Sequence, residues 1–147
     1  MSKLISHGKV RLVSARSLYS RSKTEPDMSD YYIDMCCFDY QQSMEFLLKG
    51  IVELLGEKYV TNRDLRANLN KISSIQTDNP ETIGILKELG PTFDLIRQNA
   101  STFNEWETKS RYEETFAAVS KDIELADEIC QKLDECSSKL YKTVPND

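Results

Sequence analysis

The stretch Ser29–Gly56, SDYYIDMCCFDYQQSMEFLLKGIVELLG, decides the fold of this chain of 147 residues. Its apolar residues recur every three or four positions, a spacing that gathers side chains on one face of an α-helix. Ser29 suits the N-cap and Gly56 suits the residue after the C-cap, so we expect one helix over about 29–55. The apolar face consists of Ile33, Cys36, Cys37, Tyr40, Met44, Leu47, Leu48, Ile51 and Leu55.

The rest of the chain carries the same helical spacing in four further segments. Strict alternation of apolar and polar residues is absent, so we expect no sheet. Gly90-Pro91 predicts a kink, and the polar mix of 102–113 predicts an irregular segment. Short connections between helices favour an all-α, up-and-down antiparallel bundle that forms a single domain over 1–147. The further helices are expected over about 3–20, 62–76, 80–101 and 120–141.

Two of these helices begin with capping signals. Thr61 with Asp64 resembles a capping pair at the start of the third helix. Asn79 can cap the fourth helix, with Pro80 in the first helical position.

Charge is distributed unevenly along the chain, whose net charge is −5. The first 24 residues hold six basic side chains and no acid, whereas the remainder holds 13 basic and 24 acidic ones. Three interpretations stay open: a surface for an anionic partner, a solvated helix face that complements acidic helices, and a mitochondrial transit peptide. The six basic residues are Lys3, Lys9, Arg11, Arg16, Arg21 and Lys23.

The cysteines and the single histidine argue against a metal centre or a cofactor. No CxxC occurs, and His7 cannot complete a standard zinc set. We therefore expect free buried thiols in a reducing, cytoplasmic environment. No segment is apolar enough to cross a membrane. The four cysteines are Cys36, Cys37, Cys130 and Cys136.

The chain has no GxSxG, P-loop, GxGxxG or HExxH motif. The most distinctive polar pattern lies instead on the second helix. Gln42 and Glu45 are three residues apart, and Glu45 and Lys49 are four apart. This spacing suits an ordinary surface ladder, and amides beside an ion pair can also hold a phosphate or a base edge.

The pattern resembles the second helix of the HEPN family, and the resemblance covers about residues 5–140. It implies a five-helix bundle that is commonly a homodimer and binds nucleotides or nucleic acid. Many relatives pair with a minimal nucleotidyltransferase as toxin and antitoxin, and one branch cleaves RNA with an Arg and a His on one helix. The residues that carry the resemblance are Gln41–Lys49 with Phe38 and Tyr40, Thr61–Leu65, Leu95–Arg97 through Ala100, Trp106, and Arg111-Tyr112.

The chain departs from the ribonuclease branch, because no histidine follows Arg97. Metal-independent RNA cleavage usually needs a group that transfers protons near neutral pH, and histidine is the usual one. We therefore expect no catalytic residues, although a degenerate ribonuclease stays open as an alternative.

The resemblance and the residue chemistry together predict one phosphate-binding cleft. Lys49 and Arg97 would hold phosphate, although Arg97 could equally pair with Asp94. Arg111 and Tyr112 would clamp and stack a base, or else pack on the bundle. The alternative to this binding domain is a purely structural interaction module, such as a helical dimer. Trp106 is expected to be a rim or dimer anchor. The predicted ligand-binding residues are Gln42, Glu45, Lys49, Arg97, Arg111 and Tyr112.

Overall fold

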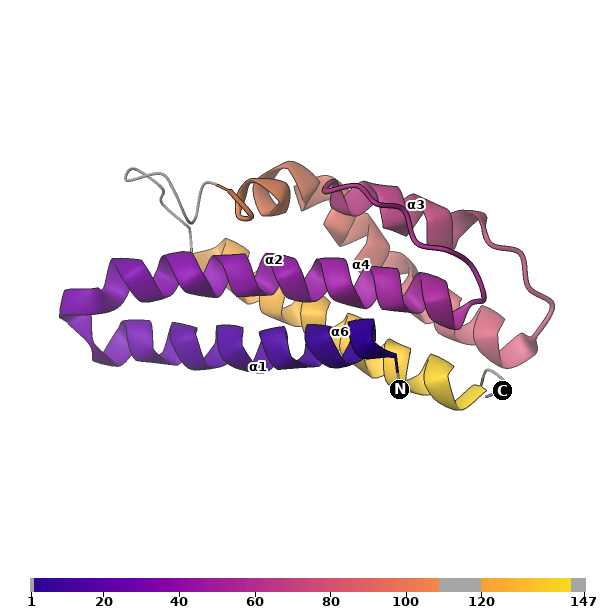
Figure 1. The fold of residues 1–147 in the computed structure, drawn as a ribbon, viewed down its shortest axis with the longest axis horizontal. Helices are drawn as coiled ribbons and strands as arrows, with labels where there is room; N and C mark the ends of the chain where they lie inside the picture. Colours follow the sequence, from indigo (N-terminus) through magenta and orange to yellow (C-terminus); the bar gives the residue numbers. More distant parts are fainter. Residues whose placement is uncertain (1, 109–119, 144–147) are drawn as a thin grey trace.

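The computed structural model describes residues 2–108 and 120–143, which form five α-helices and no strand (Figure 1). The predicted all-α fold is confirmed. The helices are α1 (Lys3–Thr24), α2 (Ser29–Leu54), α3 (Leu65–Ser74), α4 (Pro80–Glu105) and α6 (Ser120–Thr143), with a short 3-10 turn η1 (Pro26–Met28).

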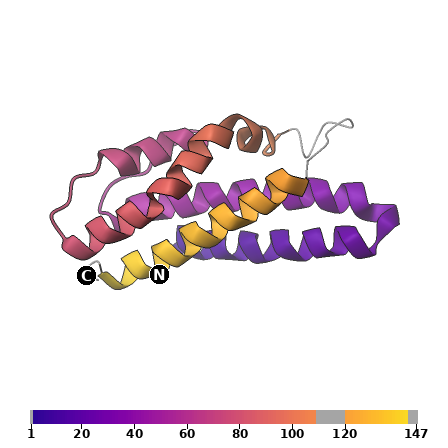
Figure 2. The same cartoon turned by 180° about the vertical axis from the view of Figure 1, so that it is seen from behind.

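Helix α2 is the centre of the bundle. It lies antiparallel to α1 and also packs against α3 and α6. Figure 2 shows α6 crossing the α1–α2 pair on the side that faces α4. The part of the chain that the structure describes contains no helix with the length and apolarity of a membrane span.

The apolar face predicted for α2 is its buried face. Seven of its members are at most 1% exposed, and Ile33 and Leu55 lie partly buried at the edge. The predicted face of α6 is buried in the same way, from Ile123 to Leu140. All four cysteines are free and buried, as expected. Burial raises the pKa of the Cys36 thiol to about 12, so this thiol is neutral and unreactive at ordinary pH.

Two glycines allow α1 and α2 to approach closely. A Cβ atom on Gly8 would stand 2.6 Å from Cγ of Leu47, and one on Gly50 would meet the side chain of Ile5. The hydroxyl of Ser43 donates to the carbonyl of Gly8 at 2.8 Å in the same contact. The absence of side chains at these positions therefore sets the distance between the two helices.

Several helix ends differ from prediction. Helix α1 continues to Thr24, four residues further than expected, and α3 begins at Leu65. Asp64 itself caps α3 by accepting from the backbone N–H of Arg66, so the predicted capping pair with Thr61 was wrong. The predicted cap at Asn79 and the stop at Gly56, whose φ is +83°, are confirmed.

Helix α4 runs through Pro91 without ending and continues to Glu105. Pro91 and Lys87 are both exposed, so water can bond the Lys87 carbonyl that lacks its helical partner. The expected irregular segment is therefore helical over 102–105. The side chain of Trp106 is 2% exposed and meets Phe103 edge to face, so the rim position predicted for this tryptophan was wrong.

Asp34, near the start of α2, gives a pH-dependent prediction. Burial, together with the charge of Asp30, raises the pKa of Asp34 to about 6. The folded state therefore binds this proton more tightly than the unfolded state, and stability falls as the pH rises from about 4 to about 6. We expect Asp34→Asn to increase the free energy of unfolding by about 1 kcal/mol near pH 7, allowing for solvent screening, and by nothing near pH 4. Urea unfolding at both pH values checks this, and an equal gain at both would contradict it.

Candidate functional site

The polar pattern predicted on α2 forms a connected ladder of side chains. The amide nitrogen of Gln42 donates to Glu45 at 3.2 Å, and Nζ of Lys49 bonds the other carboxylate oxygen at 3.2 Å. The side chains of Lys49 and Glu45 are only 16% and 13% exposed. Lys49 also stands 5.3 Å from the ring centroid of Tyr59. The structure thus brings together Gln42, Glu45 and Lys49, with the charge of Lys49 balanced by Glu45.

Gln41 extends this ladder inward, although it was not among the predicted ligand-binding residues and its burial was not expected. Its carbonyl oxygen accepts from Gln42 at 2.7 Å, and the whole side chain is buried. Its amide nitrogen is the one buried side-chain polar atom without a partner in the described part of the chain. The helical spacing Cys37, Gln41, Met44 would have indicated this burial.

Arg97 lies elsewhere, in a groove between α3 and α4. One guanidinium nitrogen donates to the hydroxyl of Ser73 at 2.9 Å, and another stands 3.4 Å from the carboxylate of Asp94. The pairing with Asp94, weighed above as an alternative, is therefore present. It is a weak pair, because Asp94 is 68% exposed and Arg97 is 39% exposed.

The groove around Arg97 is largely apolar. Its volume is about 320 Å³, and a second hollow of about 520 Å³ shares the lining residues Ile75 and Leu86 with it. Lys87 lines the second hollow. The two hollows adjoin at Ile75 and Leu86, and a guanidinium lines one and an ammonium lines the other. The remaining walls of the Arg97 hollow are Ile72, Ser73, Gly90, Phe93 and Asp94.

Among the described residues, no contact joins the α2 ladder to Arg97. Lys49 contacts Glu45 and Tyr59, whereas Arg97 contacts α3 and its own helix. Arg111 and Tyr112 lie outside the described residues. The single convergent cleft therefore remains a prediction.

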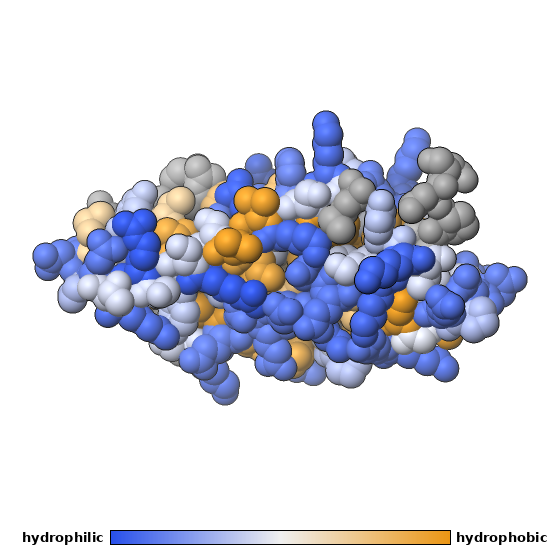
Figure 3. Space-filling view, turned by 90° about the horizontal axis from the view of Figure 1, so that it is seen from below, coloured by the Kyte–Doolittle hydropathy of each residue, from blue (hydrophilic) through white to orange (hydrophobic). Residues whose placement is uncertain are grey.

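Four of the six basic side chains of α1 form ion pairs at the surface of the bundle, three of them with acids of α2 and α6. This favours the interpretation of α1 as a face that complements acidic helices. The face seen from below, along which α1 runs, is mainly hydrophilic (Figure 3). The ion pairs are Lys9–Asp134, Arg11–Asp39, Arg16–Asp127 and Arg21–Glu25.

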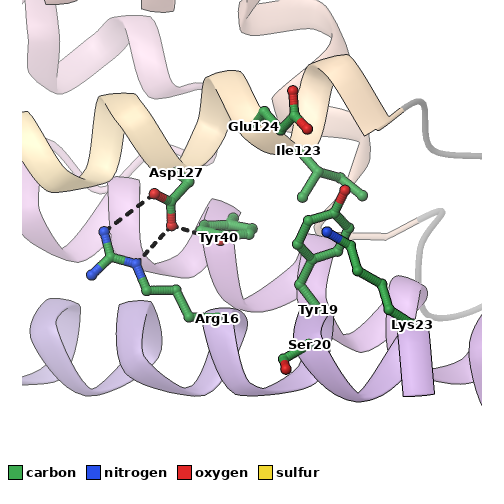
Figure 4. A pocket seen from close by; sticks show the side chains of 8 residues that line it. All are labelled: Arg16, Tyr19, Ser20, Lys23, Tyr40, Ile123, Glu124 and Asp127. Atoms are coloured by element: carbon green, nitrogen blue, oxygen red, sulfur yellow. Dashed lines mark hydrogen bonds and ion pairs between the residues drawn. The ribbon is translucent and has the colours of Figure 1, made fainter. Parts of the chain in front are cut away.

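The pair between Arg16 and Asp127, together with Tyr40, joins helices α1, α6 and α2 (Figure 4). The Arg16 guanidinium donates to both oxygens of Asp127, at 2.7 and 3.2 Å, and the hydroxyl of Tyr40 donates to the same carboxylate at 2.7 Å. Burial alone would raise the pKa of Asp127, but these hydrogen bonds outweigh it and hold the pKa below its usual value. The carboxylate is therefore charged and fully engaged.

These features define a small all-α bundle with a polar ladder on its second helix and an arginine-bearing groove beside its fourth. The model of the HEPN domain matches residues 10–146, so the chain belongs to the HEPN domain family. No curated protein and no solved structure matches the chain.

Proposed function

We propose that the chain is a non-catalytic HEPN domain that binds a nucleotide, with Arg97 as the principal phosphate ligand. The observation that carries this proposal is the position of Arg97, whose guanidinium borders an apolar groove and holds only a weak acidic partner. Guanidinium binds phosphate oxygens through paired N–H donors, which supports this assignment.

Arg97 has donors to spare. A guanidinium carries five N–H groups, and the contacts with Ser73 and Asp94 engage two of its nitrogens. The bond to Ser73 fixes the direction of the side chain, whereas an exposed pair such as that with Asp94 contributes about 0–1 kcal/mol. A phosphate can therefore displace Asp94 at little cost.

The walls of the groove suit the rest of a nucleotide. Ile75 and Leu86, which are partly exposed, offer apolar surface against which a base can pack. The adjoining hollow places Lys87 where a further phosphate would gain a second cation. The chemistry therefore favours a nucleotide over a free phosphate ion.

The absence of a suitable proton carrier supports a non-catalytic role. The chain has one histidine, His7, whose ring meets Phe46 edge to face on the α1–α2 pair. Arg97 on α4 is followed by no histidine in the sequence. Proton transfer near neutral pH would fall to poorly matched groups.

The wider proposal keeps the other predicted residues in supporting roles. Lys49, with Gln42 and Glu45, would orient a bound nucleotide, and Arg111 and Tyr112 would add charge and a stacking ring. We further propose that the domain is cytoplasmic, forms a homodimer, and works with a minimal nucleotidyltransferase as in toxin–antitoxin pairs, since the resemblance to the family implies such partners. Co-purification of the two chains addresses that part.

Calorimetry with mono-, di- and triphosphates of adenosine and guanosine tests the proposal. We expect Arg97→Ala to weaken binding about tenfold or more, because a charge-assisted hydrogen bond is lost. Arg63→Ala is the matched control, since this exposed arginine makes only a 4.0 Å contact with Glu107. It should leave the affinity unchanged.

A second variant tests the groove without changing charge. A Cβ on Gly90 would meet nothing within 4 Å, and Gly90 lines the Arg97 hollow. Gly90→Leu should therefore fold normally and fill part of the groove, weakening nucleotide binding. Absence of binding to the parent protein at about millimolar nucleotide, or equal losses with Arg63→Ala, would refute the proposal.

A further inference from the structure

A separate hollow lies between α1 and α6, beside Tyr40 (Figure 4). Its volume is about 470 Å³, within the range of pockets that hold small molecules. It is distinct from the α3–α4 groove and shares no lining residue with it. The nucleotide proposal therefore makes no use of it.

Four charged side chains line this hollow, and the charges of two of them neutralise each other. Arg16 and Asp127 satisfy each other through two hydrogen bonds, and Tyr40 completes the set. Neither group is left to hold a ligand charge without breaking this network. The wall that they form behaves as a neutral surface.

The other two charged side chains have opposite signs and no ionic partner. Lys23 and Glu124 are both exposed, and neither forms an ion pair within residues 2–108 and 120–143. Nζ of Lys23 stands 4.2 Å from the ring centroid of Tyr19, a cation–π contact that holds the ammonium at the side of the hollow. The hollow therefore presents one unpaired cation and one unpaired anion.

Apolar surface lies between these charges. Ile123 and Tyr40 line the hollow but are each only 1% exposed, so the partly exposed ring of Tyr19 forms its apolar wall. In Figure 4, Lys23 and the hydroxyl of Tyr19 point toward Ile123, on the side of the hollow opposite Arg16. A ligand would thus find the ring of Tyr19 as an apolar wall, with charged contacts at the edge.

We propose that this hollow binds a small zwitterion of the amino-acid class. Its carboxylate would pair with Lys23, its ammonium with Glu124, and its side chain would pack against the ring of Tyr19. A simple anion would meet the charge of Glu124, and a simple cation would meet that of Lys23, so a ligand with both charges fits best. The volume favours a large apolar side chain, such as that of phenylalanine or leucine.

Calorimetry on the whole chain tests this with L-phenylalanine, phenethylamine and 3-phenylpropionate. The last two each lack one of the charges. We expect the amino acid to bind about tenfold more tightly than either analogue. Lys23→Met, which keeps an apolar stem against Tyr19, and Glu124→Gln should each weaken binding of the amino acid about tenfold.

Two exposed positions on α6 supply the controls, Lys121→Met and Glu128→Gln, which change charge outside the hollow. They should leave the affinity for L-phenylalanine unchanged. The proposal is overturned if neither L-phenylalanine nor L-leucine binds at about 10 mM, if the single-charge analogues bind equally well, or if the controls lose as much affinity. Arg97→Ala should not affect this binding, so failure here is separable from failure of the nucleotide proposal.

Discussion

Replacing Trp106 by alanine is expected to lower the free energy of unfolding by about 3–5 kcal/mol. The indole is 2% exposed and is among the largest fully buried side chains in the described part of the chain. Its ring centroid lies 5.1 Å from that of Phe103, at an interplanar angle of 67°. Truncation would leave a cavity at the end of α4 and remove this aromatic contact.

Urea unfolding followed by far-UV circular dichroism measures this change, because the variant has no tryptophan fluorescence. Tyr31→Ala is the control, since Tyr31 is 55% exposed. It should cost less than about 1 kcal/mol. A similarly small loss for Trp106→Ala would place the indole at a surface rather than in the core.

The second large effect is expected where α1 meets α2. Gly8→Ala should destabilise the fold by about 1–3 kcal/mol, because the new methyl would overlap Cγ and Cδ2 of Leu47. Those atoms belong to a side chain that is itself fully buried, so it cannot move aside freely. The helices would have to separate, which also strains the bond from Ser43 to the Gly8 carbonyl.

Gly84→Ala is the matched control for this substitution. Gly84 is also helical, but a Cβ there meets nothing within 4 Å. Alanine should therefore stabilise α4 by about 0.5–1 kcal/mol through its greater helix propensity. Thermal and urea unfolding of both variants give the comparison. Opposite signs are expected, and equal stabilisation of both would show that the close approach does not constrain the fold.

Much of the fold could be predicted because it depends on local order along the chain. The face of α2, the cap at Asn79 and the stop at Gly56 follow from spacing and from the chemistry of single residues. Helix α4 was predicted to end near residue 101 because Trp106 sits in a polar stretch. The structure extends this helix because Phe103 and Trp106 gain partners in the core. Phe103 continues the helical spacing of Ile96 and Ala100, whereas the burial of Trp106 depends on contacts that spacing does not encode.

The contacts of the candidate site could likewise be predicted within one helix but not between helices. Gln42, Glu45 and Lys49 could be predicted to meet, because three- and four-residue separations on a helix guarantee it. The bond from Arg97 to Ser73 and the pairing of Arg16 with Asp127 join different helices. Neither follows from local spacing. The neutralisation of α1 could therefore be weighed from the sequence only as one of several interpretations.

The pairing of α1 with α6 has a consequence for biosynthesis. Lys9 and Arg16 precede their carboxylate partners, Asp134 and Asp127, by more than a hundred residues. A nascent chain that has emerged only as far as α4 therefore carries an uncompensated cationic flank, which would attract polyanions near the ribosome. When α6 docks, its carboxylates neutralise these two cations. Docking of the last helix therefore removes the affinity for polyanions at the same time as it completes the packing of the bundle.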